Sequence, residues 1–437
     1  MVRNLRVAFH NLGCKVNAYE TEKMISRFQA AGYTIVDFEE ESDIYVVNTC
    51  TVTQIADHKS RQLLHRAKEQ NPAATVVACG CYVETDREKA AADPRIDLLV
   101  GNRDKERIVE IVEDYLGKEG NFTQPEVLGS LRDHTRAYVK IQDGCNQFCS
   151  YCIIPFARGR IKSRPAGDIL RELSALSEAG IKEAVLTGIH LSSYGLDLSD
   201  AAFADRTLMQ VIGEAAKVPG IKRIRLGSLE PRIITEEFLS FLSETEKFCP
   251  HFHLSLQSGS DTVLKRMNRH YDTAEYFHKT EMIRAFFTHP AITTDIIVGF
   301  PGESEEEFEE TRAFLEKADL YETHIFRYSR RKGTAADRMS GQLTDRIKRE
   351  RSKILAQDNA RRMKRFSDAY AGKKATVLWE EKKTIGEKAY FTGFTEDYVK
   401  MACEAEGCRD LTNRIEEGFC SGERLEDNYM LWTRDEL

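Results

Sequence analysis

Residues 137–152 read AYVKIQDGCNQFCSYC, a short strand-like run followed at once by three cysteines, Cys145, Cys149 and Cys152. Thiolates are the usual protein ligands of iron–sulfur clusters, and a [4Fe–4S] cluster normally takes four of them. Three cysteines leave one iron without a protein ligand. An open coordination position is typical of a catalytic metal centre and not of a closed structural one.

A zinc site or a chance cluster of thiols is the alternative interpretation of these three cysteines. Zinc ribbons normally present two C-x-x-C pairs. No second pair follows Cys149 and Cys152 in the sequence. The open iron–sulfur cluster is therefore the favoured interpretation.

The chain beyond these cysteines alternates strand-like and helix-like runs, which predicts a (β/α) barrel or an incomplete one of about six units. Helix patterns begin near Pro165, Thr207, Thr235, Asp272 and Ser304. We favour the incomplete barrel. The six predicted strands are AYVKIQ (137–142), EAVLTGI (183–189), RIRLGSL (223–229), FHLSLQS (252–258), TDIIVGF (294–300) and THIFRYS (323–329).

The segments on either side predict two further domains, so that the fold class is α/β with three parts. Strands at 5–12, 43–50, 75–81 and 96–101, separated by helices at 18–31 and 54–70, predict a parallel sheet. Residues 373–437 have strand patterns separated by turn residues and predict a small all-β module. The expected domains are 1–117, 135–371 and 372–437, with 118–134 as a linker rich in turn-forming residues.

Three cysteines of the first domain, Cys14, Cys50 and Cys81, each follow the end of a predicted parallel strand. The carboxyl ends of such strands lie along one edge of a sheet, where ligands bind, so remote cysteines can converge there. Three thiolates at that edge could hold a second cluster. Buried thiols are also common core fillers, and that is how we interpret Cys79, Cys249, Cys403, Cys408 and Cys420.

The bulk composition sets the cellular context. The chain has 437 residues, eleven cysteines and a net charge of −7. It has no apolar run near the roughly 20 residues that span a bilayer, and no signal-peptide pattern at the start, so we expect a cytoplasmic protein without a membrane role. Thiols stay reduced in that compartment, which favours metal binding over disulfides.

The motif C-x-x-x-C-x-x-C after the first barrel strand resembles the radical S-adenosylmethionine (SAM) superfamily. This resemblance implies SAM as a cofactor, chelated by the open iron and cleaved to a 5′-deoxyadenosyl radical. The aromatic residue before the last cysteine and residues at the strand ends would contact SAM. The implied contacts are Tyr151, Gly188, Ser228, Glu230 and Gln257.

With the N-terminal cysteines added, the whole chain resembles the methylthiotransferases. The resemblance implies a second [4Fe–4S] cluster on Cys14, Cys50 and Cys81, and an RNA-binding, TRAM-like β-domain. The motifs LGCKVNAYE, NTCTVT, LTGIHLSSYG and HLSLQSGSDTVLKRMNR resemble the MtaB branch, which acts on N6-threonylcarbamoyladenosine beside the tRNA anticodon. Lys15 and Val16 separate this branch from those acting on isopentenyladenosine or on a ribosomal-protein aspartate. The implied partners are tRNA, a flavodoxin- or ferredoxin-type electron donor and a sulfur source.

A basic stretch at 344–366 is a candidate RNA contact, because nine Lys and Arg stand there against three acidic residues. A solvated helix face with ion pairs one turn apart is the alternative. Further candidates are Arg330, Arg331 and Lys332, and Arg158, Arg160, Lys162 and Arg164 beyond the barrel cysteines.

Two functions of other classes stay open at this stage. One is a non-catalytic iron–sulfur regulator that binds RNA, which would leave the residues at the strand ends unexplained. The other is a zinc-binding structural protein, which would be colourless where iron–sulfur clusters are brown.

Overall fold

The N-terminal sheet of the computed structural model, which describes residues 5–117, 135–198, 207–407 and 409–434, has the strand order β2-β1-β3-β4-β5. All neighbouring strands pair in parallel, as predicted. The sequence analysis missed only β2, an edge strand of three residues, which is too short to show a pattern. The strands are β1 (Arg6–Asn11), β2 (Thr34–Val36), β3 (Ile44–Thr49), β4 (Thr75–Gly80) and β5 (Leu98–Val100).

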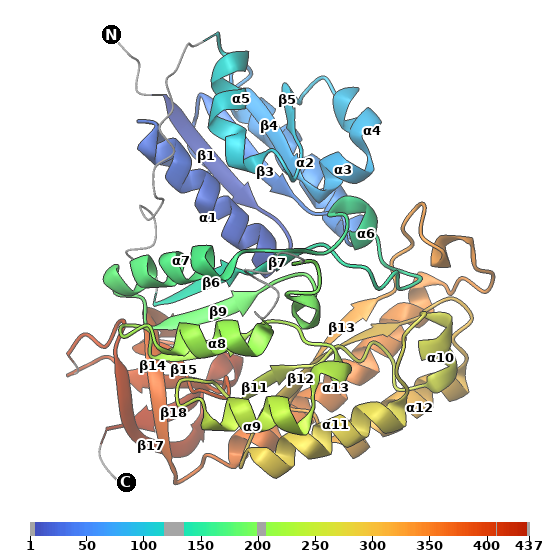
Figure 1. Cartoon of the computed structure of the whole chain (residues 1–437), viewed down its shortest axis with the longest axis vertical. Coiled ribbons are helices and arrows are strands. Elements are labelled where there is room, and N and C mark those ends of the chain that lie inside the picture. The colour runs from blue at the N-terminus through green and yellow to red at the C-terminus, as the bar shows by residue number, and fades with distance from the viewer. Residues whose placement is uncertain (1–4, 118–134, 199–206, 408, 435–437) are drawn as a thin grey trace.

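Helices cover both faces of this sheet. Side chains of α1 (Lys15–Ala30) and α5 (Ile108–Tyr115) pack in one apolar cluster, and those of α2 (Gln54–Gln70) pack in another on the opposite face. Both central strands, β3 and β4, are buried along their whole length. Burial on two faces explains why these strands are continuous apolar runs. Short helices α3 (Cys81–Thr85) and α4 (Arg87–Ala91) follow β4 (Figure 1).

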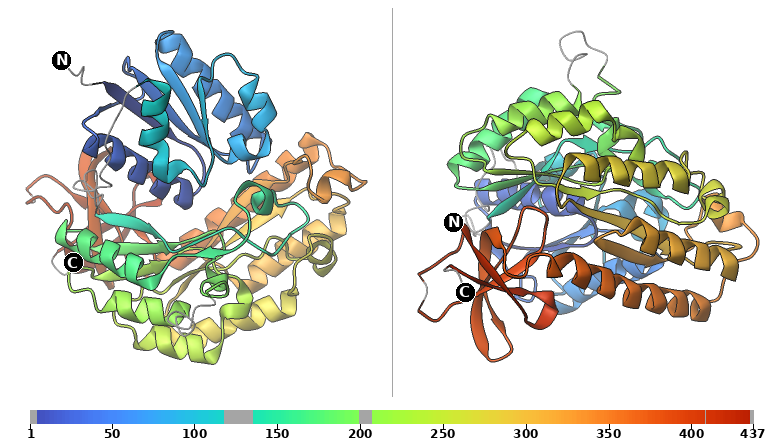
Figure 2. Two further views of the ribbon diagram at one scale, coloured as in Figure 1. Left: turned by 45° about the horizontal axis from the view of Figure 1, so that its top comes forward. Right: turned by 90° about the horizontal axis from the view of Figure 1, so that it is seen from below.

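The central domain is an open barrel of six parallel strands, which confirms the incomplete barrel. Two three-stranded sheets, β6-β9-β10 and β11-β12-β13, are joined by the bridges Ile224↔Phe248 and Leu229↔Leu254. In the left view of Figure 2 the N-terminal domain lies above the barrel, and its helix α1 contacts β6. The strands are β6 (Arg136–Lys140), β9 (Glu183–Thr187), β10 (Arg223–Leu226), β11 (His251–His253), β12 (Ala291–Val298) and β13 (Glu322–Arg327).

The outer helices begin where capping residues predict. Thr207, Thr235, Asp272 and Ser304 each accept a hydrogen bond from a backbone N–H of the first turn. The helices of this domain are α6 (Ile154–Ala157), α7 (Ala166–Glu178), α8 (Leu208–Ala216), α9 (Glu236–Glu244), α10 (Asp261–Arg266), α11 (Thr273–Phe286), α12 (Glu305–Ala318) and α13 (Asp345–Asp368). Within the described residues no helix has both the length and the apolar composition needed to cross a membrane.

The C-terminal residues form a closed barrel with the strand order β14-β15-β16-β18-β17, which confirms the predicted all-β fold. Its core contains Trp379 and Trp432, whose rings meet edge to face 5.1 Å apart. Cys403 and Cys420 are buried in the same core, where they act as apolar fillers. The strands are β14 (Lys374–Ile385), β15 (Lys388–Phe394), β16 (Lys400–Glu404), β17 (Ile415–Arg424) and β18 (Met430–Thr433).

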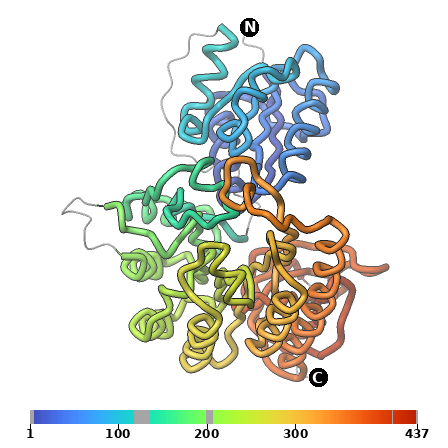
Figure 3. Tube along the Cα trace, turned by 90° about the vertical axis from the view of Figure 1, so that its right-hand side faces the viewer, coloured from blue at the N-terminus to red at the C-terminus, as the bar shows by residue number. Residues whose placement is uncertain are grey.

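The C-terminal barrel closes the amino-terminal end of the open barrel. Arg223 donates to the backbone carbonyls of Thr376 and Phe394, and Arg225 donates to that of Glu396. Tyr398 stacks on His251 with ring centroids 5.0 Å apart. In Figure 3 the red segment lies beside and behind the orange segment, in the half of the molecule opposite the N-terminus.

Glu183 neutralises the arginines at this closed end. It is fully buried, and its Oε1 lies 2.9 Å from Arg225 Nε and 2.8 Å from Arg136 Nε. Burial alone would raise the pKa of Glu183, but the charges of Arg225 and Arg136 outweigh burial and lower this pKa to about 2.

This ionisation makes stability depend on pH. Because the folded pKa lies below the unfolded value, Glu183 contributes stability above about pH 4.5, and the contribution is lost as the pH falls towards about 2. We expect this group to account for about 2 kcal/mol of the change in urea-unfolding free energy between pH 6 and pH 3, because part of its contribution remains until the pH falls below the folded pKa. Glu183→Gln should have a lower free energy of unfolding than the wild type at pH 6, and this free energy should change less with pH. The exposed control Glu178→Gln should follow the wild type. Equal pH profiles for wild type and Glu183→Gln would contradict this account.

Candidate active site

The three N-terminal cysteines converge at the carboxyl edge of the sheet, as the parallel topology predicts. Cys14 caps α1 after β1, Cys50 directly follows β3, and Cys81 is the first residue of α3 after β4. Gly13 packs so closely that an added Cβ would lie 3.0 Å from Cys50 Sγ. Burial, together with the neighbouring Cys81 and Cys14, raises the pKa of the Cys50 thiol to about 11. We call Cys14, Cys50 and Cys81 the sheet triad.

Cys79 lies apart from the sheet triad although it is only two residues from Cys81. Its side chain is fully buried inside the sheet, and its Sγ contacts the backbone carbonyl of Val47 at 3.6 Å. Since β-strand side chains alternate between faces, Cys79 points into the core between α1 and the sheet. Its interpretation as a core thiol fits this placement.

The barrel cysteines, which we call the barrel triad, lie on the loop between β6 and α6. The loop is held by Gly144, at φ +68°, where an added Cβ would collide with the backbone carbonyl of Arg160. Cys145 Sγ accepts the backbone N–H of Gln147 at 3.4 Å. Burial, together with the neighbouring Cys149, raises the pKa of Cys152 to about 12. The loop therefore gathers Cys145, Cys149 and Cys152 around one point.

The spacing of both triads fits a cluster better than a single ion. A tetrahedral zinc site holds its sulfurs about 3.8 Å apart, because Zn–S bonds are about 2.3 Å long. Among the described His, Cys, Asp and Glu side chains, one trio alone brings three ligand atoms within 4.8 Å of one another, and it contains no cysteine. Both thiol triads are wider than a zinc site.

Two of the expected SAM contacts lie beside the barrel triad. Glu230 accepts from Gln147 Nε2 at 3.1 Å, and its carboxylate lies 3.4 Å from His190 Nε2. Burial would raise the pKa of Glu230, but its hydrogen bond with His190 contributes to a net lowering. Tyr151 is packed in an apolar cluster with Phe300, and burial raises its pKa well above the ordinary value.

The other three expected contacts lie at the carboxyl ends of β9, β10 and β11. Gly188 is packed against Gln142, whose Oε1 would lie 2.9 Å from an added Cβ, so its small size already has a structural reason. Ser228 is half-buried and lies two residues beyond the end of β10. Gln257 is buried and has a left-handed backbone with φ of 75°. A strained backbone at the carboxyl end of a barrel strand is typical of a functional position.

Arg269 is a site residue that the sequence analysis missed. Its Nη1 donates to Cys149 Sγ at 3.1 Å, and its guanidinium lies over the Tyr271 ring at 4.8 Å. It is also 3.9 Å from Glu230. The motif KRMNR contains this residue, but nothing in the motif indicates that it folds back 120 positions to a thiol.

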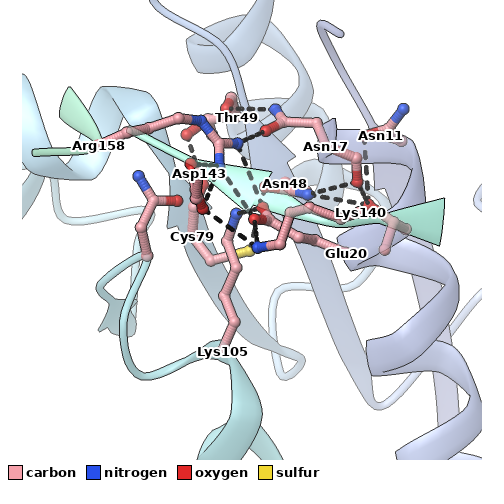
Figure 4. A network of polar contacts seen from close by, with 12 residues as sticks. Asn11, Asn17, Glu20, Asn48, Thr49, Cys79, Lys105, Lys140, Asp143 and Arg158 are labelled. Atoms are coloured by element: carbon pink, nitrogen blue, oxygen red, sulfur yellow. Dashed lines mark hydrogen bonds and ion pairs between the residues drawn. The ribbon is translucent and has the colours of Figure 1, made fainter. Parts of the chain in front are cut away.

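A buried ionic network joins the two domains beside the triads (Figure 4). Glu20 of α1 contacts Lys105 Nζ at 2.6 Å, Lys140 Nζ at 2.7 Å and Arg158 Nη1 at 3.0 Å. Asp143 balances part of the remaining charge, at 3.1 Å from the same Arg158 nitrogen. Burial alone would raise the pKa of Glu20, but Lys105 and Arg158 hold it well below its usual range. We call these five residues the junction network.

The junction network also connects the triads to each other. α6, which begins two residues after Cys152, contacts α3, which begins with Cys81. The positive charge of Arg158 counteracts the raising of the Cys81 pKa by burial, so this guanidinium lies within electrostatic range of the sheet triad. The two triads thus face one junction between the sheet and the barrel.

Several basic residues that we considered for RNA contact are engaged within the protein. Arg331 is buried and pairs with Asp57 at 3.0 Å beside the sheet triad. In α13, Lys348, Arg351 and Arg362 are buried, and Arg351 contacts Glu305 at 3.0 Å. Four exposed basic residues of α13 form further pairs: Arg346 with Glu350, Arg361 with Asp358, Lys364 with Asp368, and Arg365 with Glu316. The ion-paired helix face is therefore the better interpretation of this stretch.

Of the basic residues beyond the barrel triad, two remain exposed. Arg158 belongs to the junction network, and Arg164 pairs with Glu172 at 2.8 Å. Arg160 and Lys162 are exposed, and the Arg160 guanidinium lies 4.4 Å from the centre of the Phe148 ring. A basic surface next to the barrel triad is thus smaller than the sequence suggested.

An open six-stranded barrel with three thiols after its first strand is the architecture of a radical SAM protein. Residues 139–315 match the Radical SAM superfamily, which implies a [4Fe–4S] cluster and SAM, and residues 6–101 match a family described as uncharacterized protein family UPF0004. The radical SAM methyltransferase TsrM from Kitasatospora setae has the same fold, with a TM-score of 0.56 at 15% identity over 76% of this chain and 77% of that chain.

Sequence relatives define the family more closely. The chain is 40% identical to the threonylcarbamoyladenosine tRNA methylthiotransferase MtaB of Bacillus subtilis, over 94% of this chain and 92% of the relative. It is 38% identical to MtaB of Aquifex aeolicus, over 92% of this chain and 97% of the relative. The tRNA-2-methylthio-N6-dimethylallyladenosine synthase of Acetivibrio thermocellus is 34% identical to it, over 91% of this chain and 85% of the relative. The chain belongs to the radical SAM methylthiotransferase family.

Proposed function

We propose that this chain converts N6-threonylcarbamoyladenosine at tRNA position 37, next to the anticodon, to its 2-methylthio derivative. The observation that carries the proposal is the meeting of two thiol triads at one junction, through the contact of α3 with α6. The higher identity to the MtaB relatives than to the dimethylallyladenosine synthase supports the choice of base. The proposed domains are residues 1–117, 135–371 and 372–437.

The two triads are the proposed ligands of two [4Fe–4S] clusters. Their donor set fits, because each offers three thiols, spaced more widely than for a single ion, and leaves one iron open. With SAM bound, the clusters would supply a 5′-deoxyadenosyl radical and a sulfur that already carries a methyl group. The proposed ligands are Cys145, Cys149 and Cys152 for the first cluster, and Cys14, Cys50 and Cys81 for the second.

The surrounding side chains position the reactants and stabilise charge. Arg269, which donates to Cys149 Sγ, holds this side chain in place. Glu230 offers a carboxylate for the SAM ammonium group, and its contacts with Gln147 and His190 hold its orientation. The proposed SAM contacts are Tyr151, Gly188, Ser228, Glu230 and Gln257.

Two further partners follow from the chemistry. Forming the radical takes one electron for each SAM cleaved, and we assign its delivery to a flavodoxin- or ferredoxin-type protein. The transferred sulfur must come from a separate donor, because the triad thiols serve as ligands.

Exposed aromatic side chains beside the barrel triad support RNA as the substrate. Phe148 and Phe156 keep 39% and 59% of their surface exposed, and their rings meet edge to face 6.5 Å apart. Arg160 lies over the Phe148 ring. Unpaired bases stack on aromatic rings and arginine planes, which is how single-stranded loops are usually bound.

Removing one of these rings should weaken RNA binding. We expect Phe156→Ala to cost about 1–3 kcal/mol in the affinity for an anticodon stem-loop, because one stacking surface is lost. The matched control is Phe286→Ala, an exposed phenylalanine of α11. Fluorescence anisotropy with a labelled stem-loop gives both affinities. Equal affinities for the two variants would rule out this contact.

Mass spectrometry of tRNA nucleosides tests the proposed function. The reconstituted protein is incubated without oxygen with reductant, SAM and tRNA that carries threonylcarbamoyladenosine. We expect the 2-methylthio derivative of that nucleoside. A parallel reaction with tRNA that carries isopentenyladenosine should give no product, and product only from that substrate would overturn the assignment of the base.

The iron–sulfur regulator makes the opposite prediction in the same experiment. It would bind RNA, yet form neither 5′-deoxyadenosine nor a thiolated nucleoside in protein that carries both clusters. 5′-Deoxyadenosine without the nucleoside product would keep the radical chemistry and reject this substrate.

A further inference from the structure

The strands β11, β12 and β13 carry two histidines and one aspartate on the same face of their sheet. His253 pairs with Thr293 across β11 and β12, and Asp295 pairs with His324 across β12 and β13. Thr293 and Asp295 are two residues apart, so their side chains lie on one face of β12. One ligand atom from each of His253, Asp295 and His324 lies within 4.8 Å of the other two. We call these three residues the His–Asp trio.

The His–Asp trio faces the interior of the open barrel. Ile292 and Ile296 of β12 pack in the core with side chains of the outer helices, so Asp295, which alternates with them, points to the other face. Ile297, on the same face as Asp295, packs against the same apolar cluster as Tyr151. The trio therefore lies inside the barrel, on the face that leads towards the barrel triad.

Thr293 orients the ring of His253. Its Oγ1 lies 2.9 Å from His253 Nδ1 and 3.4 Å from Nε2 of the neighbouring His251. Burial, followed by the charges of Arg225 and Lys15, lowers the pKa of His251 well below its ordinary value, so this ring is neutral and its Nε2 can accept the one hydroxyl proton of Thr293. The Thr293 oxygen then accepts the proton of His253 Nδ1, which leaves the lone pair of His253 Nε2 available to a metal.

The ligand atoms of the trio are accessible and are not bonded to each other. His253 Nε2 and Asp295 Oδ2 lie 3.4 Å apart. In the described ranges of the chain, no hydrogen bond joins these two atoms or reaches the His324 ring. The side chains of Asp295 and His324 keep 27% and 46% of their surface exposed, so an ion from solution can reach them.

This arrangement fits one divalent transition-metal ion. Two ligands on a tetrahedral ion with bonds of about 2.1 Å lie about 3.4 Å apart, which is the separation of His253 Nε2 and Asp295 Oδ2. Two imidazoles and one carboxylate are a ligand set of catalytic zinc and of non-haem iron. A histidine that binds a metal normally donates its other ring N–H to a nearby oxygen, as His253 does to Thr293.

The charges around the trio favour a cation. Glu322 lies two residues before His324, on the same face of β13, and its carboxylate is 3.9 Å from His324 Nδ1. Of the two positive groups that act on this region, Arg225 is paired with Glu183 at 2.9 Å. The other, Lys15, carries one charge, whereas the trio and Glu322 together carry two carboxylates. The carboxylates therefore outnumber the remaining positive charge.

We propose that His253, Asp295 and His324 bind one divalent transition-metal ion inside the barrel, at a site separate from both thiol triads. The ligand types differ, because the triads offer sulfur and the trio offers nitrogen and oxygen. Three protein ligands leave at least one coordination position open towards the barrel interior, where the ion can bind water or an oxygen of a substrate. This site is independent of which base the chain modifies.

Zinc binding by the full chain with both clusters in place tests this proposal. Zinc is the probe because iron–sulfur clusters contain none. The protein is incubated with Zn²⁺ without oxygen, desalted and analysed for zinc and iron, and the affinity is measured by calorimetric titration. We expect about one zinc per chain with the iron content unchanged, as for a single site with three protein ligands.

Substitutions at the site should weaken zinc binding in a graded way. His324→Gln and Asp295→Asn each remove a ligand, and we expect an affinity loss of more than about 100-fold. Thr293→Val keeps all three ligands but removes the partner of His253, so the loss should be about 10–100-fold. The matched control is His278→Gln, an exposed histidine of α11, which should keep the wild-type affinity. Thermal midpoints without zinc show whether each variant is folded.

Three results would overturn the proposal. The wild type might retain no zinc, or His324→Gln might bind zinc as tightly as the wild type. Zinc that binds only while iron is lost would belong to the thiol triads. If the wild type retains no zinc and His324→Gln weakens binding of the modified anticodon stem-loop, the trio binds the substrate directly and not through a metal.

Discussion

Replacing Cys50 by alanine will separate the two halves of the reaction. The variant should retain the barrel cluster, and iron content should fall from about eight to about four per chain, because each [4Fe–4S] cluster holds four. It should still cleave SAM to 5′-deoxyadenosine under reduction, since Cys145, Cys149 and Cys152 lie in another domain. It should form no 2-methylthio nucleoside, because the sheet triad would lack a ligand.

A matched control is available in the same sheet. Cys79 is as buried as Cys50, but its Sγ contacts a backbone carbonyl in the core and not the sheet triad. Cys79→Ala should keep both the iron content and the product. Methylthiolation by Cys50→Ala at the wild-type rate, or loss of half the iron in Cys79→Ala, would reject the assignment of the sheet triad. The readouts are iron analysis and mass spectrometry of the nucleosides.

Replacing Glu20 by glutamine should loosen the junction between sheet and barrel. The isosteric change leaves Lys105, Lys140 and Arg158 with only Asp143 as an acidic partner in the junction network. Removing one partner from a buried ionic group typically costs about 3–5 kcal/mol, because the remaining charges stay desolvated. We expect a lower thermal midpoint, and faster hydrogen exchange in α1 and β6, which contact each other across the junction.

An exposed ion pair provides the comparison. Glu350 pairs with Arg346 on the surface of α13, and such pairs contribute less than about 1 kcal/mol. Glu350→Gln should therefore leave the thermal midpoint almost unchanged. If both variants behave alike, the junction network does not hold the two domains together. Product formation should fall more than SAM cleavage in Glu20→Gln, because only the former needs both triads.

The chain sequence determined the fold class and the six candidate cluster cysteines. Strand patterns and capping residues such as Thr207 and Ser304 are local, so they were predicted correctly. The convergence of the sheet triad was also predictable, because parallel strands place their carboxyl ends at one edge. The role of the cysteines as ligands, the SAM contacts and the domain boundaries stay predictions. The proposed linker 118–134 lies outside the described residues.

The tertiary structure alone decided what the charged residues do. Arg331 and Arg351 were candidates for RNA contact in the sequence, yet both are buried against acidic partners. Local patterns reveal which groups a chain carries, whereas the charge that each group meets depends on long-range packing. The energy of a buried charge is set by those partners, and they come together only when the chain folds.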